Sequence, residues 1–454
     1  MLRSVNPLND EVIAVHQPHS LHEVNQIVLD TQKAWLTWKE TTFHHRSQCM
    51  LRAADQLLEK QDAYACMMVL EMGKTYRQAL VEVEKCASAC RFYAEHAEAF
   101  LANESIETEA RSSYIAYNPI GIVLAVMPWN FPFWQVFRFA APALMAGNAA
   151  VLKHASNVMG CAMAIEEVFR EAGFPDNVFR SLRIAGSEVA NVISNRYVKA
   201  VTLTGSVPAG SAVAEIAGGE LKKTVLELGG SDPYLVLEDA DLEYAAETCV
   251  TSRLINSGQS CISAKRFIVV NEVFDEFEKL FVEKMKLKIM GDPFNESTDL
   301  GPQAQVKLRN ELHEQVTKSI RQGAHCLLGG EIPDRAGAWY PPTVLSDVKK
   351  GMPAWEEELF GPVAALIRAK DETDMIAIAN DSVFGLGAAV FTANHERGRK
   401  IAETQLNAGC CFVNDFVKSD PRLPFGGIGH SGYGRELSYP GIREFMNIKT
   451  VWVR

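Results

Sequence analysis

The run Gly121-Ile122-Val123-Leu124-Ala125-Val126 is apolar throughout, and Pro128-Trp129-Asn130-Phe131-Pro132 ends it. Such an unbroken run predicts a strand that is buried on both faces, as in a parallel sheet. Two similar runs follow, Ala149-Ala150-Val151-Leu152 and Ala200-Val201-Thr202-Leu203, with helical segments between them. This strand–helix–strand alternation predicts a doubly wound α/β sheet that binds ligands at the carboxyl ends of its strands.

Regions of different periodicity flank this core. Before it, residues 20–103 are dominated by helical spacing: Ser20 can cap a first helix, and further helices are predicted over Thr42–Glu59, Asp62–Glu71 and Thr75–Leu101. Glu104–Tyr117 alternates like a strand or hairpin. The tail, Ile448–Val453, alternates in the same way and is a candidate to pair with Ser113–Tyr117 across a subunit boundary.

A second α/β series follows Gly229. Its predicted elements are strands at Tyr234–Leu237, Arg266–Val270, Val363–Ile367 and Ala388–Thr392, and a helix over Val273–Met290. We place the seam between the two domains between Glu227 and Cys261.

Composition restricts the class of protein. A chain of 454 residues is too long for one ordinary core, so two or three domains are expected. Its formal charge of −11, without a basic cluster, argues against nucleic acid and anionic membranes as partners. No targeting segment and no uncharged membrane-length stretch is visible. The ten cysteines form no CxxC pair, so we expect reduced thiols, no metal site and a cytoplasmic location.

Two motifs combine a sulfur nucleophile with a base. Cys261 ends Asn256-Ser257-Gly258-Gln259-Ser260-Cys261, and Glu227 lies in Leu226-Glu227-Leu228-Gly229-Gly230. Each has a structural alternative, because a cysteine is more often an inert buried residue and a Glu beside Gly-Gly is more often a turn terminus. Together they suit nucleophilic catalysis on an aldehyde.

Polar residues at strand ends add further candidates. The Asn130 amide, with the backbone amide of Cys261, could stabilise an oxyanion, or it could satisfy its own turn. Gly205 and Ser206 follow a strand, where backbone amides can approach a pyrophosphate, although a tight turn is as good an explanation. Lys153 also ends a strand and could bind ribose hydroxyls or be a solvated surface lysine.

Two charged positions remain open. Arg138 lies in an otherwise apolar helix and needs an anionic partner, which is either a structural carboxylate or a substrate carboxylate. Spacing alone favours the structural one. Glu358 ends an acidic run, Glu356-Glu357-Glu358, that by itself indicates a solvated face.

Taken together, the motifs resemble those of the aldehyde dehydrogenase superfamily over nearly the whole chain. Six occur in the family's order: PWNFP, the strand-ending lysine, TGS, LELGG, GQSC and ELFGP, followed by Pro424-Phe425-Gly426-Gly427. The resemblance implies a doubly wound Rossmann-type cofactor domain (residues 1–103 and 123–228), an α/β catalytic domain (229–433) and a small β oligomerisation element (104–122 and 434–454) that forms a homodimer or homotetramer.

The resemblance also implies roles. Cys261 is the expected nucleophile, Glu227 the general base, and Asn130 part of the oxyanion hole. The expected contacts to NAD or NADP are Trp129, Lys153, Ser156, Gly205, Ser206, Glu358 and Phe360. In the implied reaction the Cys261 thiolate attacks the aldehyde, the thiohemiacetal oxyanion collapses with hydride transfer to the nicotinamide, and water activated by Glu227 hydrolyses the thioester.

Within the superfamily the chain is most similar to short bacterial succinate-semialdehyde dehydrogenases. The stretch Lys153–Gly160 resembles that group's lysine motif, the chain starts close to its first helix, and Arg138 and Ser419 occupy expected substrate-binding places. Two departures matter. Ser156 replaces an acid that binds the adenosine ribose in many relatives, so NADP becomes acceptable and NAD is not excluded. Ile255 stands where some relatives carry a second arginine, which weakens the substrate assignment.

The leading hypothesis is therefore NAD(P)-dependent oxidation of succinate semialdehyde. The alternatives are a dehydrogenase of another small aldehyde and a cofactor-independent thioester or ester hydrolase that uses Cys261 and Glu227. A binding protein on a retired enzyme fold is disfavoured because nucleophile and base are both present.

Overall fold

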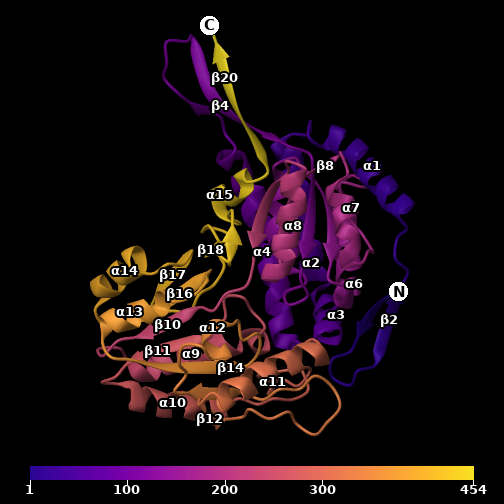
Figure 1. The fold of residues 1–454 in the computed structure, drawn as a ribbon. Coiled ribbons are helices and arrows are strands. Elements are labelled where there is room, and N and C mark those ends of the chain that lie inside the picture. Colours follow the sequence, from indigo (N-terminus) through magenta and orange to yellow (C-terminus); the bar gives the residue numbers. More distant parts are fainter.

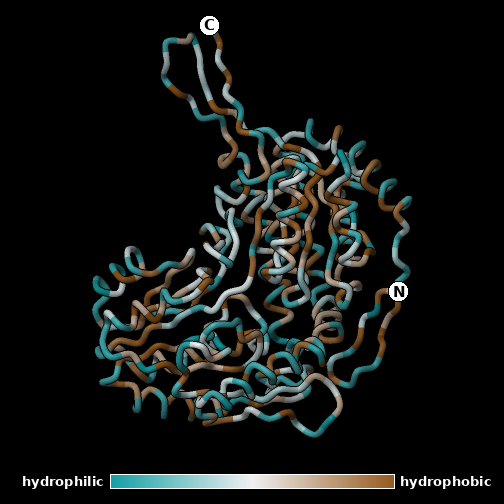
Figure 2. The backbone as a smooth tube through the Cα atoms, in the orientation of Figure 1, coloured by the Kyte–Doolittle hydropathy of each residue, from teal (hydrophilic) through white to brown (hydrophobic).

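A computed structural model describes residues 1–454, and it is built around two β-sheets from which a narrow arm projects (Figure 1). This is the α/β architecture that the sequence predicts. Apolar strands occupy the interior around each sheet, whereas the outer helices carry mixed polarity (Figure 2). None of the helices combines the length and apolar character needed to cross a bilayer.

The first sheet has six strands, and five of them run parallel. Their order is β19 (Gly432–Tyr433), β9 (Lys223–Glu227), β8 (Val198–Thr204), β5 (Ile122–Met127), β6 (Ala149–His154) and β7 (Phe179–Ser181), with β19 antiparallel to β9. The chain builds β5, β6 and β7 outward and then returns to add β8 and β9 on the other side. The order therefore reverses between β5 and β8, and the carboxyl ends of these two strands mark the topological switch point.

Helices cover this sheet on both faces. The connections from β5 to β6 and from β6 to β7 run toward one edge of the sheet, and those from β7 to β8 and from β8 to β9 run toward the other edge. Because such connections are right-handed, α5 and α6 lie on one face and α7 and α8 on the opposite face. The helices of this half are α1 (Leu21–Trp38), α2 (Phe43–Glu59), α3 (Gln61–Met72), α4 (Tyr76–Phe100), α5 (Trp134–Met145), α6 (Met159–Glu171), α7 (Val189–Ile193) and α8 (Val207–Gly219). Ser20 caps α1, as the sequence predicts, and forms a capping box with Glu23. Thr42, expected as the first residue of the second helix, is instead the cap of α2.

The second sheet has seven strands and is predominantly parallel. Its order is β12 (His325–Leu328), β13 (Thr343–Ser346), β14 (Val363–Ala369), β11 (Arg266–Val270), β10 (Pro233–Val236), β16 (Gly387–Phe391) and β17 (Cys410–Val413). Its helices are α9 (Leu242–Leu254), α10 (Phe274–Lys286), α11 (Val306–Arg321), α12 (Pro353–Glu356), α13 (Glu372–Asn380) and α14 (His395–Thr404). The chain passes from the first sheet to the second between Glu227 and Pro233.

Short pairs of strands complete the fold. They are β1 (Leu2–Val5) with β2 (Val12–His16), and β15 (Phe384–Gly385) with β18 (Ile428–Gly429).

The arm consists of β3 (Glu104–Ser105), β4 (Ser112–Pro119) and β20 (Met446–Val453). The predicted pairing of the tail with Ser113–Tyr117 is present, but the proposed subunit boundary between them is wrong. β20 pairs antiparallel with β4 of the same chain, from Met446 opposite Pro119 to Val453 opposite Ser112. Both segments leave the body at neighbouring points, so one chain can close the ladder by itself (Figure 1).

Only part of the 434–454 segment belongs to the arm. Helix α15 (Ser438–Arg443) packs against α4 and α5 in the body, and β20 alone projects from it. Apolar side chains on the projecting strand remain uncovered, with Ile448 62% and Trp452 51% exposed.

Candidate active site

The turn before Cys261 has an unusual backbone. Asn256, Ser257 and Gly258 take φ values of 55°, 54° and 76°, so three consecutive residues are left-handed. Residues other than glycine adopt this conformation at a cost, and they keep it only where the surroundings hold them. Buried hydrogen bonds do so here: the Ser257 hydroxyl donates to the Gly301 carbonyl at 3.2 Å, and the Ser257 carbonyl accepts from the Gln303 amide at 3.2 Å.

Two buried cations clamp the same turn. The Arg253 guanidinium donates to the carbonyls of Gly258 at 2.6 Å and Ala264 at 2.7 Å. The Lys265 ammonium donates to the carbonyls of Ser260, at 2.9 Å, and Cys261. Because these bonds engage carbonyls on both sides of Cys261, they fix the position of its side chain.

Asn130 joins the loop after β5 to this turn. Its side-chain amide donates to the Gln259 carbonyl at 3.1 Å, and the Asn130 carbonyl accepts from the Asn256 amide at 2.7 Å. From α4, the buried Glu82 carboxylate accepts the backbone amides of Phe133 and Trp134, both at 2.9 Å, at the start of α5. The loop that carries Asn130 is therefore held at both ends.

The elbow after β9 approaches the nucleophile turn closely. A side chain at Gly230 would place its Cβ 2.9 Å from the Cys261 carbonyl, and one at Gly229 would meet Glu358 at 2.3 Å. The Glu358 carboxylate accepts the Gly230 amide at 3.0 Å and lies 3.5 Å from the Lys265 ammonium. The Gly229-Gly230 elbow, the turn before Cys261 and the segment that carries Glu358 therefore meet at one point. The two glycines permit this close approach because they have no side chain.

Glu227 ends β9 and is almost completely buried. Neither of its carboxylate oxygens has a hydrogen-bond partner in the chain. Burial raises the pKa of Glu227 well above its usual value, and the nearby Glu436 carboxylate raises it further, against the opposing effect of Arg138. A buried carboxyl with a raised pKa and no hydrogen-bond partner within the chain has the properties of a general base that can take a proton from water.

Arg138 has an internal partner that the sequence did not identify. Its side chain is 2% exposed and forms an ion pair with Glu436, and it also donates to the Thr204 hydroxyl at 3.2 Å. The guanidinium stacks over the Phe425 ring, 4.7 Å from the centroid. Its charge is therefore compensated within the protein, as expected of a structural arginine.

Cys261 opens onto a cavity of about 420 Å³. The other lining residues are Arg77, Gln78, Val81, Glu82, Lys85, Phe131, Trp134, Gln135, Arg138, Ile255, Ser260, Ile262, Ser263, Phe416, Val417, Lys418, Ser419 and Phe425. The structure thus brings Cys261, Arg138 and Ser419 to one cavity. Cys261 is half-buried, because part of the residue faces this cavity. Protein atoms nevertheless surround its sulfur closely, and this burial raises the pKa of the thiol to about 12. Arg138 and Lys265 oppose that shift.

The expected cofactor contacts gather around the switch point. Lys153 is the last residue but one of β6, directly opposite Val126 on β5, and its ammonium makes no hydrogen bond or ion pair within the chain. Burial lowers its pKa. Gly205 and Ser206 precede α8, whose first turn receives no side-chain cap, and a Cβ at Gly205 would meet only Leu203 at 3.6 Å. The open N-terminus of α8 follows β8 and the unpaired Lys153 is on β6, with only β5 between the two strands, and this arrangement fits a dinucleotide with its phosphates.

The remaining cofactor candidates lie in three different settings. Ser156 is exposed where the chain leaves β6. Trp129 and Phe360 contact each other edge to face, with centroids 5.7 Å apart, and so join the loop after β5 to the second domain. Glu358, by contrast, is already engaged by Gly230 and Lys265.

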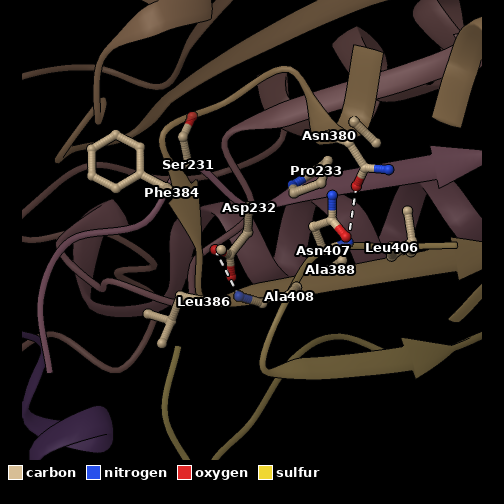
Figure 3. Close-up of a pocket in the computed structure, with 13 residues that line it drawn as sticks. Ser231, Asp232, Pro233, Asn380, Phe384, Leu386, Ala388, Leu406, Asn407 and Ala408 are labelled. Atoms are coloured by element: carbon tan, nitrogen blue, oxygen red, sulfur yellow. Dashed lines mark hydrogen bonds between the residues drawn. The ribbon is translucent and has the colours of Figure 1, made fainter. Parts of the chain in front are cut away.

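A second cavity lies at the amino-terminal ends of β10 and β16 and contains none of these residues. Asp232 and Ser231 line it, and an Asp232 oxygen accepts the Gly387 amide at 3.1 Å (Figure 3). Its volume of about 10 Å³ is roughly that of a single water site. We therefore assign no substrate to it.

Sequence reasoning missed Glu436, Lys85 and Glu82. Glu436 lies in the tail, and nothing local connects it to Arg138. Lys85 and Glu82 belong to the long Ala- and Glu-rich helix, where charged residues normally indicate a solvated face. The helical period could have signalled them, because Glu82 and Lys85 are three residues apart on one side of α4.

Comparison with known proteins places the chain. The model of the aldehyde dehydrogenase family matches residues 1–451. A Synechocystis sp. protein named as a probable succinate-semialdehyde dehydrogenase (NADP+) is 48% identical, and the match covers 100% of this chain and 99% of that protein. A Mycobacterium tuberculosis succinate-semialdehyde dehydrogenase (NADP+) is 46% identical, with the same coverage.

Solved structures agree. The crystal structure of succinic semialdehyde dehydrogenase from Streptococcus pyogenes, in complex with NADP+, matches with a TM-score of 0.97 at 35% identity, covering 100% of both chains. A family match over almost the full length, close relatives of equal length and a superimposable fold lead to the same assignment. The chain belongs to the aldehyde dehydrogenase family.

Proposed function

We propose that this protein oxidises succinate semialdehyde to succinate with NADP or NAD. The observation that carries the proposal is that Cys261 is the only thiol on the wall of a cavity with several basic side chains. The substrate is supported by the names of the relatives that are 46–48% identical over the full chain.

Each catalytic role follows from the position of a side chain. Cys261 attacks the aldehyde carbon from a turn that hydrogen bonds on both sides hold fixed. One amide hydrogen of Asn130 is engaged by the Gln259 carbonyl, and the second is available to the developing oxyanion. Glu227, which has no internal partner, takes a proton from the water that hydrolyses the thioester.

The dinucleotide supplies the hydride acceptor when bound. Lys153, Gly205 and Ser206 would hold its ribose and phosphates at the switch point. Phe360 and Glu358 lie on the second-domain side, where Phe360 contacts Trp129 of the loop after β5. We propose that NADP is preferred, because Ser156 brings no negative charge and Lys153 offers an unpaired positive one. The relatives named above are NADP+ enzymes by name.

We further propose that the arm is an oligomerisation element. The exposed Ile448 and Trp452 on β20 would be covered by another copy, in a homodimer or homotetramer. We place the enzyme in the cytoplasm, which suits ten free cysteines. The domain boundaries proposed are residues 1–103 with 123–228 and residues 229–433. Within the segments 104–122 and 434–454, the proposed oligomerisation element is the arm formed by β3, β4 and β20.

The test is a panel of aldehydes assayed with NAD and NADP in parallel, followed by absorbance of the reduced nicotinamide. We expect succinate semialdehyde with NADP to give the highest kcat/KM, and Cys261→Ser to abolish turnover. Equal rates for all short aldehydes would favour a general small-aldehyde dehydrogenase. Ester hydrolysis without any nicotinamide reduction would identify a hydrolase and overturn the proposal.

A further inference from the structure

Lys85 is a half-buried cation on the wall of the cavity that holds Cys261. It projects from α4, and its ammonium donates to the Ser419 hydroxyl at 2.8 Å. The same ammonium lies over the Trp134 ring, 4.2 Å from the centroid. An aromatic face and a hydroxyl therefore hold Lys85 in one position inside the cavity.

Lys85 differs from the other charged residues of this cavity in having no opposite charge within ion-pair distance. Each of the others is paired: Arg77 with Asp299, Glu82 with Lys74, Arg138 with Glu436, and Lys418 with Asp415. Burial lowers the pKa of Lys85 to about 8, with a further contribution from the neighbouring Arg138. An ammonium with this pKa is still mainly protonated at neutral pH, so the cavity contains one uncompensated positive charge.

An uncompensated charge of this kind is costly unless a ligand neutralises it. The Ser419 hydroxyl adds a second hydrogen-bond donor beside the ammonium, because its oxygen accepts from Lys85 and its hydrogen is free to turn toward a ligand. A carboxylate, which has two acceptor oxygens, matches this pair of donors. Ile255 also lines this cavity, and because it is apolar it adds no second charged group that could bind the carboxylate.

We propose that Lys85, together with Ser419, binds the carboxylate of the substrate and selects aldehydes that carry an acid group at the far end. This inference rests on the proposed oxidation of succinate semialdehyde. It adds to the recognition of the acid a lysine of α4, a helix in which no sequence motif indicates a substrate-binding group.

The test compares succinate semialdehyde with butanal, a neutral aldehyde of the same chain length, in Lys85→Met. Methionine keeps much of the length of the side chain and removes the charge. The ratio of kcat/KM for succinate semialdehyde over butanal is expected to fall by about 10- to 150-fold, the range for a hydrogen bond to a charged group. Lys85→Arg keeps the charge and should retain more of the ratio than Lys85→Met.

Lys418→Met is the matched control, because it removes a lysine from the same cavity whose charge Asp415 already compensates. The ratio should change by less than about threefold there, as for a surface pair. Inhibition of butanal oxidation by succinate gives a second measurement that needs no turnover of the acid aldehyde. Its inhibition constant should rise in Lys85→Met and in Ser419→Ala, and butanal turnover shows that each variant is folded.

The outcomes separate this inference from the proposed function. If the unaltered enzyme does not prefer succinate semialdehyde to butanal, the proposed function fails. If it does prefer the acid and Lys85→Met keeps that preference within about threefold, the function stands and the role of Lys85 is refuted. An equal fall in Lys85→Met and Lys418→Met would also refute it, because the effect would then come from the general field of the cavity.

Discussion

Replacing Arg138 by methionine should destabilise the protein strongly rather than change its substrate preference. The guanidinium is 2% exposed and pairs with Glu436, which is 5% exposed. Removing one partner of such a pair leaves a buried charge uncompensated, at a cost of about 3–5 kcal/mol. That is a large share of the roughly 5–15 kcal/mol that stabilises a typical domain.

A double substitution isolates the cause. In Arg138→Met with Glu436→Gln both charges are gone, so stability should return to within about 1 kcal/mol of the unaltered protein. The assay is urea unfolding followed by tryptophan fluorescence, at one protein concentration because assembly shifts the midpoint. The single variant should also oxidise succinate semialdehyde and butanal with equally reduced kcat/KM. Loss of the guanidinium raises the pKa of Glu227, which then remains protonated to higher pH and is a poorer base at pH 7.

The reasoning is refuted by the opposite pattern. If Arg138→Met unfolds at the same urea concentration as the unaltered protein and loses activity with succinate semialdehyde alone, Arg138 binds the substrate carboxylate. The reasoning also fails if Glu436→Gln alone changes neither stability nor activity, because the ion pair would then not contribute to either.

Further predictions concern the thiol, the oxyanion, the cofactor and the arm. Because the pKa of Cys261 is about 12 without cofactor, its alkylation by iodoacetamide should accelerate about tenfold per pH unit from pH 7 to 10, and a plateau below pH 9 would contradict this. Asn130→Ala should lower kcat about 10²–10³-fold while dinucleotide binding, measured by fluorescence titration, is unchanged; equal activity would remove Asn130 from the oxyanion site. Ser156→Glu should shift the kcat/KM ratio from NADP toward NAD by at least about tenfold, since a carboxylate near the 2′-phosphate repels it by a kcal/mol or more; an unchanged ratio would place the phosphate elsewhere. Removing Met446–Arg454 should reduce the molar mass in light scattering, and an unchanged mass would show that β20 is not needed for assembly.

Local periodicity predicted most of the elements because it acts over a few residues. The helix expected over Thr42–Glu59 is α2, Phe43–Glu59, and the strand expected over Arg266–Val270 is β11 with the same bounds. The helix expected over Val273–Met290 ends at Lys286, about one turn early. Lys223–Glu227 was not predicted as a strand, because a run with charge at both ends resembles a surface segment, yet β9 carries the candidate base.

Long-range pairs were beyond the reach of periodicity. The motifs located Cys261, Glu227 and Asn130, but the partner of Arg138 and the chain to which β20 pairs depend on the closed fold. Charge alone was misleading on α4, where Lys85 resembles the solvated lysines of other helices until the cavity is seen. Whether a charged side chain has an ion-pair partner, as Arg138 does and Lys85 does not, therefore cannot be predicted from the sequence alone.

The pairing of Arg138 with Glu436 also has a consequence for synthesis on the ribosome. The carboxylate is translated about 300 residues after the arginine, which corresponds to roughly 15–60 s at ordinary elongation rates. Until then the nascent first domain contains an orphan cation, and strand β19 at its edge is absent as well. Chains that terminate shortly before Glu436 cannot complete this domain, so prematurely stopped products should be recognised and degraded even though they contain nearly every catalytic group.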